Sequence, residues 1–165
     1  DFVVFTKEVD ESYPDATPLR DVAPLLSLKK AKAFEDEELP ENYLVITADT
    51  VVVVGNEIFG KPKDKDDAVR MLKALSGNVH EVVTGVTIHT KEMSRTFSVT
   101  SKVSFETLDN EEIEYYLDKY RPYDKAGAYG VQEWIGFIGV NNVEGSYFNV
   151  MGLPTHSLYK ELKCF

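Results

Sequence analysis

The sequence predicts one α/β domain in which helices flank a mixed, twisted β-sheet. Apolar runs of strand length alternate along the chain with segments of helical period, an order typical of a sheet covered by helices. Two of the strand-like runs are separated only by a short turn, which adds an antiparallel hairpin to the sheet. The chain has 165 residues, of which 43% are hydrophobic, enough for one domain with its own core. We therefore expect residues 1–165 to form a single domain.

Four apolar runs have the length and composition of strands. The opening run, residues 1–5, is almost entirely apolar, and residues 43–54 form a longer run rich in β-branched side chains. Residues 81–90 and 96–105 are separated by the turn at 91–94 and form the expected hairpin. Apolar and polar residues alternate in residues 96–105, as in a strand with one buried face.

Three segments between the strands show the helical period. In residues 64–77, four apolar side chains recur at i, i+3, i+4 and i+7, and Asp64 stands at the expected N-cap position. Residues 108–120 contain a capping box, in which Asp109 is followed three residues later by a glutamate. Residues 24–34 open on a proline and place apolar side chains at helical spacing.

The C-terminal third of the chain is rich in glycine. Residues 121–152 contain six of the ten glycines, a composition typical of loops and short strands that cover a site or an interface. A last helix is predicted to start at Pro154 and to bury Leu158 and Leu162.

Charge and cysteine content exclude several classes of partner. The formal net charge of -10 repels nucleic acid polymers and anionic membrane surfaces, so we expect neither as a partner. No apolar run approaches the roughly 18 residues of a membrane-spanning helix. The single cysteine, Cys164, has no partner for an intrachain disulfide, which favours a reducing compartment and a cytoplasmic location.

An acid interrupts the most apolar run of the sequence. Asp49 and Thr50 lie within "VITADTVVVV", and a buried carboxylate must be hydrogen-bonded, paired with a cation or bound to a metal. One interpretation is an aspartate that caps a tight turn between two strands; the other is a functional carboxylate at a strand end. Asp10 and Glu11 could join Asp49 at a divalent cation, or could be a turn pair of acids.

Lysines and an amide are the other candidates for a binding site. Lys61 lies in "GKPKD", where glycine and proline form a rigid turn that can present a fixed positive charge to a phosphate, although such turns are also common on solvated surfaces. Lys30 lies within the first helical segment, where lysines are usually solvated, and gains interest only from its position relative to the residues that follow. Gln132 lies in "AGAYGVQ" and offers an amide that both donates and accepts hydrogen bonds, although a surface glutamine in a glycine-rich turn is the alternative interpretation.

Histidines and common nucleotide motifs add no candidate. His80 is expected to make a structural hydrogen bond, and His89 and His156 have no helpful neighbours in the sequence. No spacing of His and Cys indicates zinc, and Walker A, G-x-G-x-x-G and G-x-S-x-G motifs are absent. The sequence therefore disfavours the familiar nucleotide-binding folds.

Five segments taken together resemble one protein family. "ITADTVV", "GKPKD", "LSGNVHEVVTGV", "DKAGAYGVQ" and "EGSYFNVMGLP", in this order and at these separations, resemble the Maf family of nucleoside triphosphate pyrophosphatases. The resemblance extends from Asp10 to near the C-terminus. It implies a Maf/inosine-triphosphatase-like fold with a cleft between two lobes. It also implies hydrolysis of a nucleoside triphosphate between the α and β phosphorus atoms.

The resemblance assigns a role to each candidate residue. Asp49 matches the proton acceptor of the family, and Asp49 and Glu11 match acids that could hold a divalent cation, Mg²⁺ or Mn²⁺. The positions that match substrate-binding residues are Lys30, Lys61, Glu11, Thr50 and Gln132. Of these, the two lysines correspond to phosphate contacts, whereas Thr50 and Gln132 correspond to residues linked to base choice. The family also suggests a homodimer.

Substrate choice and two departures complete the expectations. The "AGAYGVQ" form is similar to the branch that acts on dTTP and UTP, with modified pyrimidine nucleotides as further candidates. The alternatives are 7-methyl-GTP as substrate, or a non-catalytic nucleotide-binding regulator linked to cell division. The family pattern has a strand and a Ser-x-Ser-Pro-Arg-Arg loop that would precede Asp1, so we expect residues 1–5 to match its second strand. The other departure is Glu133, where many relatives have glycine.

Overall fold

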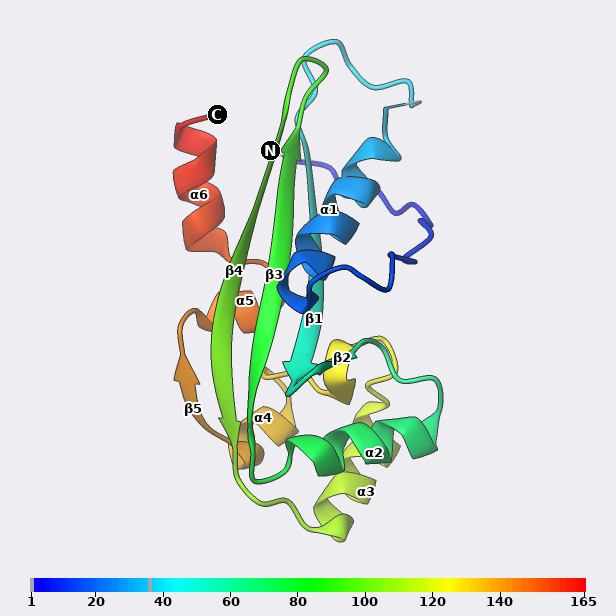
Figure 1. Cartoon of the computed structure of the whole chain (residues 1–165), viewed down its shortest axis with the longest axis vertical. Helices are drawn as coiled ribbons and strands as arrows, with labels where there is room; N and C mark the ends of the chain where they lie inside the picture. The colour runs from blue at the N-terminus through cyan, green and yellow to red at the C-terminus, as the bar shows by residue number, and fades with distance from the viewer. Residues whose placement is uncertain (1, 36) are drawn as a thin grey trace.

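The fold is a five-stranded antiparallel sheet with helices on both faces and at one end (Figure 1). The computed structural model describes residues 2–35 and 37–165. The strands lie in the order β2-β1-β3-β4-β5. Their bounds are β1 (Val45–Val54), β2 (Glu57–Phe59), β3 (Val79–His89), β4 (Ser94–Phe105) and β5 (Val140–Glu144). The helices are α1 (Val22–Lys32), α2 (Lys65–Leu75), α3 (Asn110–Tyr120), α4 (Trp134–Gly139), α5 (Tyr147–Val150) and α6 (Thr155–Lys163), with short 3₁₀ turns η1 (Leu19–Asp21) and η2 (Ala126–Ala128).

The α/β class and the β3–β4 hairpin are confirmed, but the sheet is not mixed in the part of the chain described. All four strand pairs are antiparallel. The reason lies in the connection between β1 and β3. The chain turns back through β2, and α2 then returns it to the end of the sheet that it has just left, so that Glu81 near the start of β3 pairs with Val53 near the end of β1.

Local capping signals define the helices as the sequence predicts. The Asp64 side chain accepts a hydrogen bond from the backbone N–H of Asp67 at the start of α2. At α3, Asp109 and Glu112 form the complete capping box. Each cap satisfies backbone N–H groups that have no partner within the helix, which sets the start of the helix.

Three local expectations differ from the structure. Residues 2–5 form no strand, and their side chains are 65 to 89% exposed, because none of the described strands pairs with them. Asp1 lies outside the described residues. Leu162 of α6 is 37% exposed, whereas Leu158 is buried as expected. The glycine-rich residues 121–152 contain α4 and α5 in addition to a short strand.

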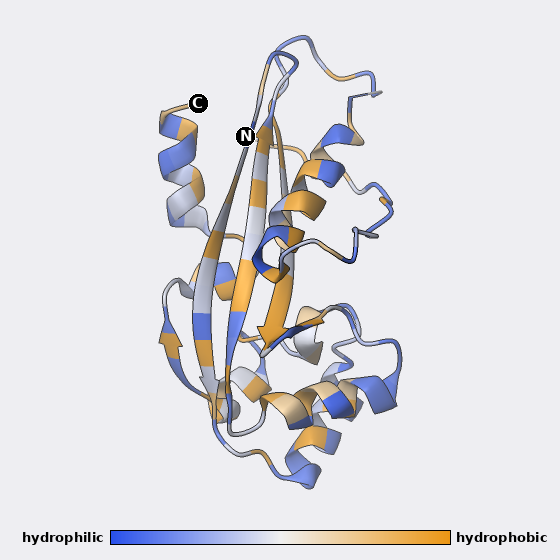
Figure 2. Cartoon of the chain, viewed as in Figure 1, coloured by the Kyte–Doolittle hydropathy of each residue, from blue (hydrophilic) through white to orange (hydrophobic). Residues whose placement is uncertain are grey.

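Two apolar clusters lie on opposite faces of β1. Val52 belongs to the larger cluster, which includes residues of α2 and α3, whereas Val51 and Val53 pack with α1 in a second cluster. Successive side chains of a strand point to opposite faces, so one valine run contributes to both. Figure 2 shows this last part of β1 as continuously hydrophobic, while hydrophobic and hydrophilic residues alternate along α2 and α3.

Gly85 sets the distance between α1 and the sheet. A Cβ at this position would lie 2.2 Å from the backbone nitrogen of Pro24, so the helix backbone packs directly on β3. We expect Gly85→Ala to destabilise the protein by about 2–3 kcal/mol, because α1 would have to move away from β3. Denaturant unfolding measures this change. Gly60→Ala is the control, since a Cβ at Gly60 meets no atom within 4 Å; equal stability of both variants would contradict the prediction.

Candidate active site

Asp49 lies in the middle of β1, not at a strand end or in a turn. It pairs with Gly85 in a ladder of β1 and β3 that continues without a break from Val45 to Val53. Both interpretations made from the sequence are therefore wrong about its local structure. The physical reason is that β2 pairs only with residues 52–54, so the earlier part of β1 is an open edge where a polar side chain can reach a cavity.

Asp49 belongs to a chain of four alternating charges. Its Oδ1 accepts a hydrogen bond from Lys30 Nζ of α1. Lys30 Nζ also lies 3.0 Å from Glu11 Oε1, and Glu11 Oε2 lies 3.5 Å from Lys61 Nζ. The Asp49 side chain is only 10% exposed, whereas that of Lys61 is 57% exposed. Four residues that were separate candidates in the sequence are thus brought together by α1, β1 and two loops.

Burial and charge act in opposite directions on this group. Burial raises the pKa of Asp49 above its usual value, against the lowering effect of the Lys30 ammonium. Burial would lower the pKa of Lys30, but hydrogen bonds and charge from Asp49 and Glu11 outweigh it, and the pKa is raised. The hydrogen bond from Lys30 lowers the pKa of Glu11. Asp49 therefore combines a buried, relatively basic carboxylate with a cation that keeps it ionised.

Asp10 is separate from this group. It accepts a hydrogen bond from Lys29 Nζ at 2.8 Å and one from the backbone N–H of Ser12 at 3.1 Å. The hydrogen bond from Lys29 lowers its pKa. The proposed set of Asp10, Glu11 and Asp49 therefore reduces to the last two, and Asp10 is a turn residue paired with a helix lysine.

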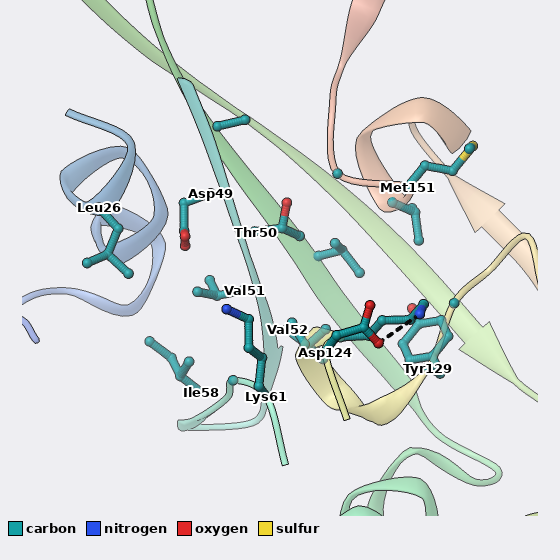
Figure 3. A pocket seen from close by; sticks show the side chains of 18 of the residues that line it. Leu26, Asp49, Thr50, Val51, Val52, Ile58, Lys61, Asp124, Tyr129 and Met151 are labelled. Carbon is teal, nitrogen blue, oxygen red and sulfur yellow. Dashed lines mark hydrogen bonds and ion pairs between the residues drawn. The ribbon is translucent and has the colours of Figure 1, made fainter. Parts of the chain in front are cut away.

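A cavity of about 520 Å³ extends around the open edge of β1. Figure 3 shows Asp49 and Thr50 on opposite sides of the strand, with Lys61 reaching toward the Asp49 side. Both faces line the cavity because β1 is its edge strand here. Thr50 Oγ1 lies 2.8 Å from Thr84 Oγ1, and Thr84 donates a hydrogen bond to the backbone oxygen of Asn149. This network fixes the orientation of Thr50.

The second wall of the cavity comes from the glycine-rich segment. Gln132 is exposed and lines the cavity. Lys125, Asp124 and Tyr129 also line it, and the last two are labelled in Figure 3. Gln132 was predicted from the sequence and Lys125 was not, although "DKAGAYG" places Lys125 directly before the small residues that allow close packing. Gly127 has a φ of +69°, and a Cβ there would lie 3.0 Å from the Val52 side chain, so this wall packs tightly against β1.

His80 and His89 form hydrogen bonds with residues outside the Asp49 group. His80 is buried, and its Nε2 lies 2.7 Å from the hydroxyl of Tyr129, as expected of a structural histidine. Burial lowers the pKa of His80 to about 4. His89 does have neighbours, contrary to the expectation, because the hairpin places its Nδ1 2.5 Å from Ser94 Oγ.

The carboxylates of the cavity suit a hard divalent cation only together with a ligand. Within residues 2–35 and 37–165, no group of three or more His, Cys, Asp or Glu side chains could hold a metal ion. Asp49 and Glu11 are two carboxylates linked through Lys30. Mg²⁺ characteristically takes one or two carboxylates and completes its shell with water and substrate phosphates, so the pair fits such an ion.

The fold and the cavity define an α/β protein with a polar cavity in which two lysines lie near a buried carboxylate. A family model described as Maf-like protein matches residues 1–165, and the chain belongs to this family. The dTTP/UTP pyrophosphatase of Porphyromonas gingivalis strain ATCC 33277 is 52% identical over 96% of this chain and 80% of its own length. Proteins of the same name from Parabacteroides distasonis and Bacteroides fragilis strain YCH46 are 51% and 50% identical, over 96% and 99% of this chain and 81% and 84% of their own lengths.

Proposed function

We propose that this protein hydrolyses dTTP and UTP to the monophosphate and pyrophosphate. The observation that supports this most directly is the convergence of Asp49, Lys30 and Lys61 in one cavity. The names of relatives about half identical to this chain support the same activity and the same two substrates. The cavity volume of about 520 Å³ is in the range of small-molecule sites.

In the proposed reaction, Asp49 accepts a proton from the attacking water. The water oxygen forms a bond to the α-phosphorus, the bond from this phosphorus to the bridging oxygen breaks, and pyrophosphate leaves with the bond electrons. Lys30 and Lys61 offset negative charge on the phosphates and on the leaving group. In the structure Lys30 donates to Asp49. Substrate phosphate would compete for this ammonium and leave an Asp49 oxygen free to accept the proton.

We further propose that Asp49 and Glu11 hold Mg²⁺ or Mn²⁺ together with substrate oxygens. When bound, such an ion supplies positive charge that neutralises the phosphates. Glu11 contacts both lysines, so its carboxylate also aligns the two cations along one side of the cavity.

Pyrophosphate release with a panel of nucleotides tests the proposed function. We expect UTP and dTTP to be hydrolysed with the highest kcat/KM in the presence of Mg²⁺ or Mn²⁺. Turnover that is highest with 7-methyl-GTP would contradict the base assignment. Nucleotide binding without turnover would contradict the enzymatic proposal and favour the regulator linked to cell division.

The remaining proposals concern the setting of the enzyme. No described helix is long and apolar enough to cross a membrane. The exposed free Cys164 favours a reducing compartment, and we propose a cytoplasmic location. The net charge of -10 argues against nucleic acid polymers as partners. We propose that residues 1–165 form one domain and, on the family resemblance, that the protein is a homodimer, which light scattering of the purified protein measures.

A further inference from the structure

Lys125 is a cation of the cavity that the proposed phosphate site does not use. Its Nζ lies 2.9 Å from Asp124 Oδ1 and 3.3 Å from Glu133 Oε1, and its side chain is 25% exposed. Figure 3 shows the labelled Asp124 and Tyr129 on the opposite side of β1 from Asp49, and the dashed line from Asp124 marks its pair with Lys125. Lys125 therefore belongs to the second wall, together with Gln132.

The charge around Lys125 differs from that around Lys30. Asp49 and Glu11 on the first wall are matched by Lys30 and Lys61, and any divalent cation there adds positive charge. On the second wall, Asp124 and Lys125 line the cavity and offset one another, and Glu133 pairs with the same ammonium from outside the cavity lining. This wall therefore offers no unmatched positive charge to a triphosphate, whereas a neutral nucleobase needs none. The phosphates therefore belong at the first wall and the base at the second.

The position of Lys125 is fixed by a hydrogen-bond network. Glu133 accepts a hydrogen bond from the hydroxyl of Tyr116, and the same hydroxyl accepts one from the backbone N–H of Gly130. Burial would lower the pKa of Lys125, but Asp124 and Glu133 outweigh this effect and keep it protonated. Glu133 stands where many relatives have glycine. In this chain it links the Lys125 ammonium, through Tyr116 and Gly130, to the loop that contains Gln132.

We propose that Lys125 is a specificity-determining residue that donates a hydrogen bond to a ring carbonyl of uracil or thymine and so disfavours cytosine. This inference rests on the proposed function. Lysine offers only donors, whereas the Gln132 amide can donate and accept. At position 4 uracil and thymine have a carbonyl, an acceptor, and cytosine has an amino group, a donor. The Lys125 ammonium and the cytosine amino group are both donors, so neither would have an acceptor when they face each other in a buried site. A hydrogen-bonding site strongly disfavours such a ligand.

Lys125→Met tests the inference through a ratio of rates. Methionine keeps much of the side-chain length and removes the donor. We expect the ratio of kcat/KM for UTP to that for CTP to fall by about 10- to 100-fold, mainly through a loss with UTP. Lys63→Met is the matched control, since Lys63 is an exposed lysine that does not line the cavity, and its ratio should not change.

The outcomes separate this inference from the proposed function. Equal losses for UTP and CTP in Lys125→Met would mean that Lys125 only supports the loop, and would overturn the inference while leaving the pyrophosphatase activity in place. Absence of turnover in the unchanged protein with every nucleotide would instead overturn the proposed function.

A second pair of variants covers the case in which Lys125→Met fails to fold. In Lys125→Gln the amide can present either a donor or an acceptor to the base, so the preference for UTP over CTP should narrow. In Glu133→Gln the acceptor for Tyr116 remains, but the negative charge that holds Lys125 is lost. The preference for UTP over CTP should therefore become smaller in this variant as well. An unchanged preference in both variants contradicts the inference.

Discussion

Asp49→Asn is expected to lower kcat/KM for UTP by about 10³-fold, in the middle of the range for loss of a general base. The asparagine amide has nearly the same shape as the carboxylate, but it cannot accept the proton of the attacking water. It also removes the negative charge that pairs with Lys30. Pyrophosphate release under saturating and subsaturating UTP, with Mg²⁺ present, measures the change.

The control for Asp49→Asn is the same substitution on the surface. Asp66→Asn changes an exposed acid in the first turn of α2 and should leave the activity within about twofold, because isolated surface charges contribute little. Thermal unfolding should show that both variants are folded. An Asp49→Asn protein with more than one tenth of the original kcat/KM would mean that another group accepts the proton.

Lys30→Met is expected to lower kcat/KM by about 10²- to 10³-fold and to shift the acid limb of the pH profile to higher pH. Catalysis requires ionised Asp49, so activity rises as the pH passes its pKa. Burial already raises this pKa, and Lys30 opposes the rise. Without the Lys30 ammonium, the pKa of Asp49 loses its main lowering influence, while burial and the charge of Glu11 still raise it. The pKa of Asp49 rises further, and ionisation needs a higher pH.

The pH profile distinguishes this role of Lys30 from a purely structural one. Lys32→Met changes an exposed lysine of the same helix and should leave both the rate and the acid limb in place. A damaged fold would lower the rate at every pH by the same factor and would not move the limb. An acid limb that stays in place or shifts to lower pH in Lys30→Met would contradict the proposed coupling between Lys30 and Asp49.

Local sequence patterns were sufficient for most elements of the fold. The helical period and the caps at Asp64 and Asp109 predicted α2 and α3, since both signals depend on residues within a few positions of one another. The β3–β4 hairpin followed from two alternating runs and a short turn. Residues 2–5 have the composition of a strand but form none in the part of the chain described, because a strand depends on a partner that its own sequence does not specify.

The candidate residues were identified from the sequence, but their arrangement was not. Asp49 was expected at a strand end, because an acid in an apolar run is normally a boundary, and the open edge of β1 that permits it in mid-strand depends on how short β2 is. Lys125 was missed because its place in the cavity and its ion pair with Glu133 come from packing of the glycine-rich segment and not from a local pattern.

By itself the sequence determined the α/β class, the helix boundaries within a few residues, the membership suggested by five ordered motifs, and the acids and lysines of the site. These properties depend on local periodicity and on residue identity. Only the tertiary structure decided that the described sheet is antiparallel, that Lys30 contacts both Asp49 and Glu11, and that Lys125 lines the same cavity. The physical reason is that such contacts join residues distant in the chain, and strand pairing and close packing at Gly85 and Gly127 set their distances.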